Sequence, residues 1–551
     1  MRNWPTRPTR LLPSLQVLFI LLLLVVVGQD NWAQPRVQIP PSVNTSGVDN
    51  LIIQGKELES RQQWSDAQIH YRDALRQYPD HEDLQALLKT AGIHSNLARR
   101  YHDTSFLTSL STISQDKARD SFSEVLLKIQ THHFEQPRWE AIARQGMQHF
   151  QIALSDPLLL KHHQIDPSSV ALKEFLDASN ELIRKRQHTR RADLVQTVLL
   201  IAQNAHDAIQ LPVAATLLEF TCGTASGMDK YSCYLTPHQL DEMFSQIAGN
   251  FVGIGIELKS SLAELKVIRV IPAGPASEGG IQPGDLVLSV DGQAIPRISP
   301  SQAADMLRGP DGSQVRVTIR RDGSPPRQIT LHRRRVEIPS IEDVKIIDQE
   351  NRIGYLRITC FQKTTSQDLD DALWRLHRQG MKSLVIDIRN NPGGLLIGSV
   401  EVADHFLDQG TIVRTRGRSS HEDVDYKAHE LGTWNLPIVV LINGNSASAS
   451  EIFAGAIHDH QRGHVVGHTS YGKGSVQGIF PLSNTTAGVR LTTARFFSPS
   501  GHAISNAGVT PDVLVHVAKR PTSNGSTSLP DRLDPILDAG LAVLRESLLQ
   551  P

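Results

Sequence analysis

The stretch LINGNSASASEIFAGAI, from Leu441 to Ile457, joins an apolar run to a helical pattern through alternating serine and alanine. Serine favours the N-cap of a helix, so these residues could be ordinary caps. The alternation also leaves hydroxyl groups uncovered beside the free N–H groups of a helix N-terminus, as a nucleophile requires. The stretch therefore predicts a strand, a loop and a helix, and raises the question of which serine reacts and which group takes its proton.

Strand-like and helix-like segments alternate on both sides of this stretch. A helical pattern covers 368–380, and the apolar runs that predict strands lie at 352–358, 382–389, 410–416, 437–444 and 464–469. Such alternation predicts an α/β domain whose helices cover a mostly parallel sheet. Sites in these sheets gather beyond the carboxyl ends of the strands. Both the loop IDIRNNPGG, from Ile386 to Gly394, and the serine-rich loop leave strands in this way.

Residues 251–323 have a different pattern. The segments FVGIGIEL and LKVIRVI are followed by GPASEGGIQPGDLVLSVDGQAI, the amphipathic SQAADMLRG and the strand-like QVRVTIRRDG. This order of turns, short helices and strands predicts a small barrel with two helices. The segment resembles a PDZ domain. That resemblance implies that an extended peptide adds itself as a strand, and that backbone N–H groups hold its terminal carboxylate.

The resemblance assigns roles to individual positions of this segment. The residues expected to form the carboxylate-binding loop and the apolar groove beside it are Gly253, Ile254, Gly255, Ile256 and Leu307. The structural alternative for the glycine loop is a tight turn that opens a strand. Arg308, at the end of the groove helix, matches an arginine that lies near a neighbouring domain in proteins that this segment resembles. It either reports peptide binding to the active site or is a solvated cation at a helix end.

The N-terminal half of the chain reads mainly as helices. Gly55, Ala67, Tyr71, Ala74 and Pro79 have the spacing of one tetratricopeptide repeat, in which two antiparallel helices pack through small and aromatic positions. A single repeat cannot bury its faces alone, so we expect this arm to dock on the body of the protein. The alternative is an arm that binds an adaptor or a second copy of the chain.

The first residues indicate export. Arg2, Arg7 and Arg10 precede an unbroken apolar run from Val17 to Val27, which is typical of a signal peptide or a short membrane anchor. We expect a protein of the cell envelope or periplasm, either cleaved or held at the inner membrane. The 56 Lys and Arg against 57 Asp and Glu give a net charge of −1, so charge does not favour a nucleic-acid partner.

The base that serves the serine is either a histidine or a lysine. His458, His460, His464 and His468 lie nearby, but neither a hydrolase elbow nor a zinc-binding H-E-x-x-H motif is present. The segment YGKGSVQ instead places Lys473 between two glycines. Such a lysine can enter a confined cleft, where desolvation favours its neutral, proton-accepting form. The alternative for this lysine is an exposed loop position.

The motifs together resemble the carboxy-terminal processing proteases of family S41. The resemblance rests on SASASEIFAG, YGKGSVQ, DIRNNPGG, the PDZ-like segment and GMDKYSCYLTP at 227–237. It implies that Ser448 is the nucleophile, that Lys473 is its base, and that Gln477 orients the lysine amine. It also implies that the backbone N–H groups of Gly394 and Ala449 hold the oxyanion. Ser446 and Ser450 are then interpreted as capping and packing residues, and no metal or cofactor is required.

The fold class expected from these patterns is a multidomain α+β chain with a helical N-terminal region, a PDZ small β-barrel and an α/β serine-protease core. The expected divisions are a leader at 1–34, the tetratricopeptide-like arm at 48–100, helices at 101–237, the PDZ domain at 238–335, the protease core at 336–520, and a linker with a C-terminal helix at 521–551.

The expected activity is that of a serine endopeptidase acting on proteins with free C-termini. One alternative is a PDZ scaffold on an inactive protease fold, and another is a serine hydrolase of small esters. The PDZ-like segment argues against the ester hydrolase, because such a module binds polypeptide ends. Of the three cysteines, Cys222 and Cys233 either pair or are small buried residues, and we favour burial.

Overall fold

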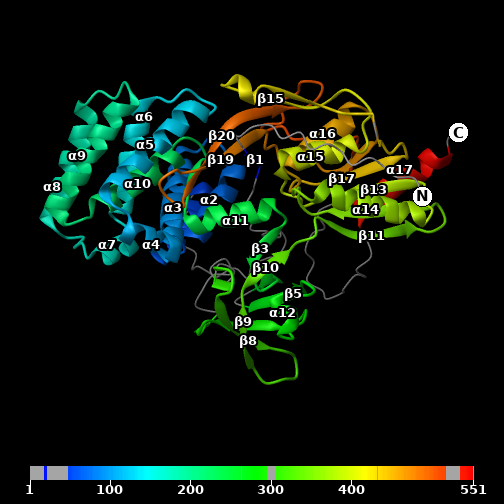
Figure 1. The fold of residues 1–551 in the computed structure, drawn as a ribbon, viewed down its shortest axis with the longest axis horizontal. Coiled ribbons are helices and arrows are strands. Elements are labelled where there is room, and N and C mark those ends of the chain that lie inside the picture. Colours follow the sequence, from blue (N-terminus) through cyan, green and yellow to red (C-terminus); the bar gives the residue numbers. More distant parts are fainter. Residues whose placement is uncertain are drawn as a thin grey trace.

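The computed structural model describes residues 18–21, 47–261, 264–294, 306–430, 432–516 and 534–549. Three parts are visible: an all-helical part, a core with two sheets, and a small β module below the junction of the other two (Figure 1). The three cysteines are free in this structure.

The all-helical part is built around one helix, α10, that is buried on all sides. In α10 every residue from Ala214 to Ala225 is buried, as expected for a helix surrounded by others. Its core also includes Val489 and Leu491 of an antiparallel sheet, so the helices and the protease core share packing. The helices are α1 (Gly47–Ser60), α2 (Trp64–Gln77), α3 (Glu82–His102), α4 (Thr104–Thr112), α5 (Gln115–His132), α6 (Trp139–Ala153), α7 (Pro157–His163), α8 (Val170–Lys185), α9 (Arg191–Ile209) and α10 (Val213–Ser226).

The repeat-like arm docks on the other helices. Gly55 lies against Tyr71, since a Cβ added to Gly55 would stand 2.1 Å from the Tyr71 ring. This contact explains the small and aromatic positions of the repeat pattern. From α3, His94 Nδ1 lies 2.6 Å from Asp156 Oδ2 at the start of α7, and Arg100 Nη2 lies 2.6 Å from Glu219 Oε2 in α10. The arm is therefore anchored by a buried His94–Asp156 hydrogen bond and a buried Arg100–Glu219 ion pair.

The first sheet of the core is the predicted parallel one. Its order is β11-β12-β13-β17-β18-β21, and all neighbours are parallel except the edge strand β11. Alternate side chains pack beneath α14, α15 and α16 on one face and beneath α17 on the other. The elements are β11 (Ile341–Asp348), β12 (Ile353–Ile358), α14 (Thr365–Arg378), β13 (Ser383–Asp387), α15 (Leu396–Asp404), β17 (Ile438–Ile442), α16 (Ala449–Asp459), β18 (His464–Gly467), β21 (Val513–Leu514) and α17 (Pro535–Leu549).

The second sheet is antiparallel and was not expected as a separate sheet. The strand predicted at 410–416 is β15. It pairs with β16 and β20, so it belongs to this sheet and not to the parallel one. The order is β14-β1-β19-β20-β15-β16, with β2 also on β20. The elements are β1 (Leu18–Leu21), β2 (Cys233–Leu235), β14 (Gly394–Leu395), β15 (Thr411–Gly417), a 3-10 turn (Ser420–Glu422), β16 (Val424–Lys427), β19 (Ser475–Pro481) and β20 (Gly488–Phe497).

The small β module contains the predicted barrel strands. Helix α11 (Pro237–Ile247) leads into it, and the strand pair β3–β10 stands at its base. Of the helix expected at 301–309, Met306 and Leu307 are helical, and 295–305 lie outside the described residues. The remaining elements are β3 (Asn250–Gly253), β4 (Ile256–Ser261), β5 (Glu264–Val270), α12 (Pro275–Glu278), β6 (Leu286–Val290), β7 (Gln293–Ala294), β8 (Gln314–Arg320), β9 (Arg327–His332) and β10 (Arg334–Glu337).

The expected leader lies mostly outside the described residues. Of 1–34 the structure describes only 18–21, which form β1 between β14 and β19, antiparallel to both. Among the helices described, none has the length and apolar character needed to cross a membrane. The expectation of a signal peptide or anchor stays a prediction.

Candidate active site

Ser448 stands where the serine-rich loop turns into α16. It is the N-cap residue, with φ of +67° and ψ of −115°. Such a backbone conformation is strained for a residue with a side chain, and strain of this kind concentrates at functional turns. Ser448 is fully buried, and its Oγ has no hydrogen-bond partner within the part of the chain that the structure describes. The turn therefore leaves this hydroxyl available.

The neighbouring serines are already engaged. Ser446 Oγ donates to Ile388 O at 2.8 Å, and Ser450 Oγ donates to Asn391 O at 2.9 Å. Both hydroxyls thus fasten the serine-rich loop to the loop after β13. The interpretation of Ser446 and Ser450 as packing residues agrees with these contacts, but the helix cap is Ser448 itself. The contacts distinguish Ser448 from the serines on either side of it.

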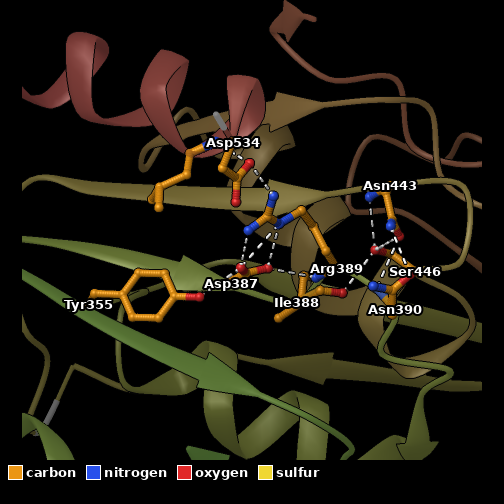
Figure 2. A network of polar contacts seen from close by, with 9 residues as sticks. Tyr355, Asp387, Ile388, Arg389, Asn390, Asn443, Ser446 and Asp534 are labelled. Carbon is orange, nitrogen blue, oxygen red and sulfur yellow. Dashed lines mark hydrogen bonds and ion pairs between the residues drawn. The ribbon is translucent and has the colours of Figure 1, made fainter. Parts of the chain in front are cut away.

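The loop after β13 is held by a polar network. Figure 2 shows Arg389 between Asp387 and Asp534, with the Tyr355 hydroxyl directed at Asp387. Arg389 Nη2 lies 2.6 Å from Asp387 Oδ2, its Nη1 lies 2.7 Å from Asp534 Oδ1, and Tyr355 donates to Asp387 at 2.8 Å. These contacts also tie the start of α17 to the loop. The network fixes the chain just before the two glycines that approach Ser448.

Those glycines, Gly393 and Gly394, allow the loop to lie against Ser448 on one side and Phe361 on the other. Their φ values are +105° and +142°, which favour glycine. A Cβ on Gly393 would stand 2.8 Å from Ser448 Cβ and 2.9 Å from Ala449 N, and one on Gly394 would stand 2.0 Å from Phe361 O. The structure thus brings the Gly393–Gly394 turn and the start of α16 together, where the oxyanion donors are predicted.

Lys473 lies in the turn before β19 and is almost completely buried, with 1% of its surface exposed. Burial, together with the nearby Arg490 guanidinium, lowers the pKa of its amine from 10.5 to about 7, while the Glu451 carboxylate opposes the shift. A large fraction of this amine is therefore neutral near neutral pH. The alternative of an exposed loop lysine is wrong, because the lysine is buried.

Glu451 joins the backbone of Ser448 to that of Lys473, and sequence reasoning missed it. Its carboxylate accepts from Ser448 N at 2.6 Å, Lys473 N at 2.9 Å, Gly472 N at 2.6 Å and Ser470 Oγ at 2.6 Å. Burial raises its pKa, although these donors favour the ionised form. The signal in the sequence was the capping-box pattern S-x-x-E at 448–451, in which the glutamate reaches back to the cap N–H.

Gln477 is buried on β19 close to this turn. Its Nε2 donates to Ser475 Oγ at 3.0 Å, and its Oε1 has no hydrogen-bond partner among the described residues. The predicted role of this amide, orienting the Lys473 amine, stays a prediction because the amide here turns toward Ser475.

Two of the histidines considered as bases or zinc ligands, His458 and His460, have other partners. His460 Nε2 donates to Thr411 O at 2.7 Å, and His458 lies beside Asp459 and Asp512. The described part of the chain contains no group of three side chains placed to hold a metal ion. Among the described residues, Ser448 and Lys473 share Glu451 as a hydrogen-bond partner, and no histidine has such a shared partner with Ser448.

The predicted peptide groove of the β module is partly described. Gly255 takes φ of +81° at the bend between β3 and β4, where glycine adopts such angles without strain. Ile254 and Leu307 are buried in the module's core, whereas Ile256 is half-buried beside it. Arg308 Nη1 lies 2.5 Å from Glu242 Oε1 on α11. Arg308 is therefore paired with the segment that leads to the core rather than free in solvent.

Comparisons with known proteins show which families this chain is similar to. A model of peptidase family S41 matches residues 352–515, and a model of the PDZ domain matches 266–321. The chain is 35% identical over 359 residues to a carboxy-terminal-processing protease of Bartonella bacilliformis, covering 64% of this chain and 80% of that protein. It is 33% identical over 298 residues to a probable CtpA-like serine protease of Staphylococcus epidermidis, covering 54% and 60%. A solved photosystem II D1 C-terminal processing protease shares 27% identity with a TM-score of 0.40, covering 72% and 93%.

Proposed function

The chain belongs to peptidase family S41 and is a carboxy-terminal-processing serine peptidase, and from this premise we propose that Ser448 and Lys473 form its catalytic dyad. The observation that carries the proposal is the buried Glu451 carboxylate, which accepts hydrogen bonds from the backbone of both residues. One side chain thereby sets the distance between the nucleophile turn and the lysine turn. Preorganised geometry of this kind lowers the entropic part of the barrier.

The proposed reaction follows from the protonation states. Ser448 Oγ attacks the scissile carbonyl carbon while neutral Lys473 accepts its proton, and the lysine then donates that proton to the leaving amine. Water, deprotonated by the same lysine, then cleaves the resulting acyl-enzyme ester. The N–H groups of Gly394 and Ala449 are the proposed donors to the oxyanion, and the second of them lies at the N-terminus of α16.

We propose that substrate binds as a strand in the gap that β1 fills. β1 pairs with β19 on one side and β14 on the other, with Ile20 opposite Gln477 and Leu21 opposite Gly394. A single extended strand thus completes the sheet directly beside the proposed oxyanion donors. Strand addition supplies main-chain hydrogen bonds that do not depend on side-chain identity. The cleft is therefore suited to peptides and not to small esters.

We also propose that the β module captures the C-terminus of the substrate. Its Gly253–Ile256 loop supplies backbone N–H groups to a terminal carboxylate. The contact from Arg308 to Glu242 continues to the cleft, because α11 packs its apolar residues against Leu395 of β14 and Ile479 of β19. Through this path, a peptide bound in the groove of the β module can shift the positions of β14 and β19, the strands proposed to hold the substrate. The basic and apolar N-terminal segment supports exported proteins as the natural substrates.

The dyad is tested with a fluorophosphonate probe that labels activated serines. We expect the parent chain to be labelled at Ser448 and the Ser448→Ala chain to remain unlabelled, and peptide mapping locates the label. The Ser446→Ala chain should still be labelled at Ser448. Labelling that persists in Ser448→Ala, or that maps to Ser446 or Ser450, would overturn the assignment of the nucleophile.

A further inference from the structure

The aromatic ring of Tyr231 lies over the amine of Lys473. The distance from Lys473 Nζ to the centre of the ring is 4.7 Å. Tyr231 belongs to the segment GMDKYSCYLTP, which precedes the β module in the chain, whereas Lys473 follows it. The half-buried ring therefore covers one side of the buried lysine amine.

The backbone around Tyr231 is held on both sides. Asp229 Oδ1 accepts from Tyr231 N at 2.6 Å and from Ser232 N at 2.9 Å. Its Oδ2 accepts from His133 Nε2 at 2.9 Å, just after α5 of the helical part. Arg490 Nε of β20 donates to Tyr231 O at 2.8 Å. The helical part and the antiparallel sheet thus fix the position of this ring together.

Two effects of the ring on the lysine oppose each other. The ring excludes water from one side of the amine, which favours the neutral form. Its π face attracts the ammonium ion, which favours the charged form. Burial is the largest influence on the lysine, so its pKa is lowered to about 7 overall. The charged groups that face the amine from the surrounding elements are Arg490, Glu451, Lys230 and Asp229.

We propose that Tyr231 is a positioning residue for Lys473, whose ring closes the lysine pocket to water and holds the amine toward Ser448. This inference rests on the proposed dyad and deepens it, because it assigns the wall that keeps the base neutral. It also explains why a helical part is packed onto the protease core. The His133–Asp229 contact places the turn that carries the ring.

The test compares Tyr231→Ala with Tyr231→Phe in the full chain, with Tyr78→Ala in the arm as a control for loss of a tyrosine elsewhere. The pH dependence of kcat/KM is measured on one peptide. Loss of the ring admits water to the amine and so raises the pKa of Lys473. In Tyr231→Ala the acidic limb of the kcat/KM profile should therefore move upward by about one pH unit. It should also lower kcat by at least about tenfold, since general-base catalysis contributes roughly 10²–10⁴. Tyr231→Phe should keep the parental limb.

A second readout does not depend on activity. In a Ser448→Ala background, the pH dependence of reductive methylation of Lys473 reports its pKa by mass spectrometry, with and without Tyr231→Ala. An upward shift in the double variant supports the inference, and identical methylation curves would overturn it. If Tyr231→Ala fails to fold, as judged by thermal unfolding, Tyr231→Ser takes its place as another small residue, and a parental acidic limb in that variant would contradict closure by the ring. Retained activity in Lys473→Arg would instead refute the dyad.

Discussion

The proposed cleft and the β module are built differently. In the cleft, Ser448, Lys473 and Glu451 are each at most 1% exposed, and the Glu451 carboxylate accepts four hydrogen bonds from the two turns. The module meets the core through partly exposed ion pairs such as Arg308–Glu242, whose side chains are 33% and 21% exposed. The difference teaches that the groups of the proposed dyad are held in one geometry, whereas the β module is joined to the core by contacts that can break and form again. Substitutions in the two regions should therefore differ in effect by orders of magnitude.

The largest expected effect is at Lys473. Lys473→Ala removes the base, and Lys473→Arg replaces it with a guanidinium that stays protonated. Peptide cleavage should fall at least about 10³-fold in both, because triad-type groups act as a unit. Steady-state kinetics on one peptide measures the loss, and thermal unfolding verifies the fold. Comparable turnover in either variant and the parent would remove the lysine from the mechanism.

The next effect is expected at Glu451. Glu451→Gln leaves one acceptor oxygen and turns an NH₂ group toward backbone N–H donors, so the two turns should separate. A displacement of about 1 Å can cost roughly 10²-fold in rate. The measurement is kcat on the same peptide, with the exposed Glu546→Gln as the control. An unchanged kcat in Glu451→Gln would show that the carboxylate does not set the dyad's geometry.

A smaller effect is expected from the substrate's C-terminus. Amidation removes the carboxylate, and a hydrogen bond to a charged group is worth ~1.5–3 kcal/mol. The amidated peptide should therefore be cleaved about tenfold more slowly, or slower still. Gly255→Ala should reduce this discrimination. Gly323→Ala, also at a positive-φ glycine of the module, should retain it. Equal cleavage of both peptides would show that the module does not recognise chain ends.

The smallest effect is expected at the contact between module and core. Partly exposed ion pairs contribute up to ~1 kcal/mol, so Arg308→Ala should lower kcat/KM by about fivefold or less. If the ion pair transmits peptide binding in the β module to the active site, kcat/KM should fall for the peptide with a free C-terminus and not for the amidated peptide. Glu242→Gln should give the same pattern, and the double variant should add little. Equal losses with both peptides would make the pair merely structural.

Local patterns predicted much of the cleft. The strand pattern predicted that the serine-rich loop and the loop IDIRNNPGG leave two strand ends, and the structure brings Gly393 of one loop against Ser448 of the other. The choice of Ser448 and Gly394 within these loops came from the resemblance to S41 peptidases and stays a prediction. The strand predicted at 410–416 exists, but its place in the antiparallel sheet did not follow from the pattern. Period-two alternation reports one buried face and not the identity of the partner strand. Tyr231 was quoted in the sequence only as part of a motif, without a role.

The sequence by itself determined most of the elements, the turn between β17 and α16, and the resemblance to S41 peptidases, because these depend on residues close together in the chain. The tertiary structure decided which groups surround Lys473. Glu451, Tyr231 and Arg490 come from a helix, a turn before the β module and a distant strand, and they meet only when two sheets and the helical part pack together. The low pKa of the lysine comes from that packing, because desolvation requires neighbours that the local sequence does not name.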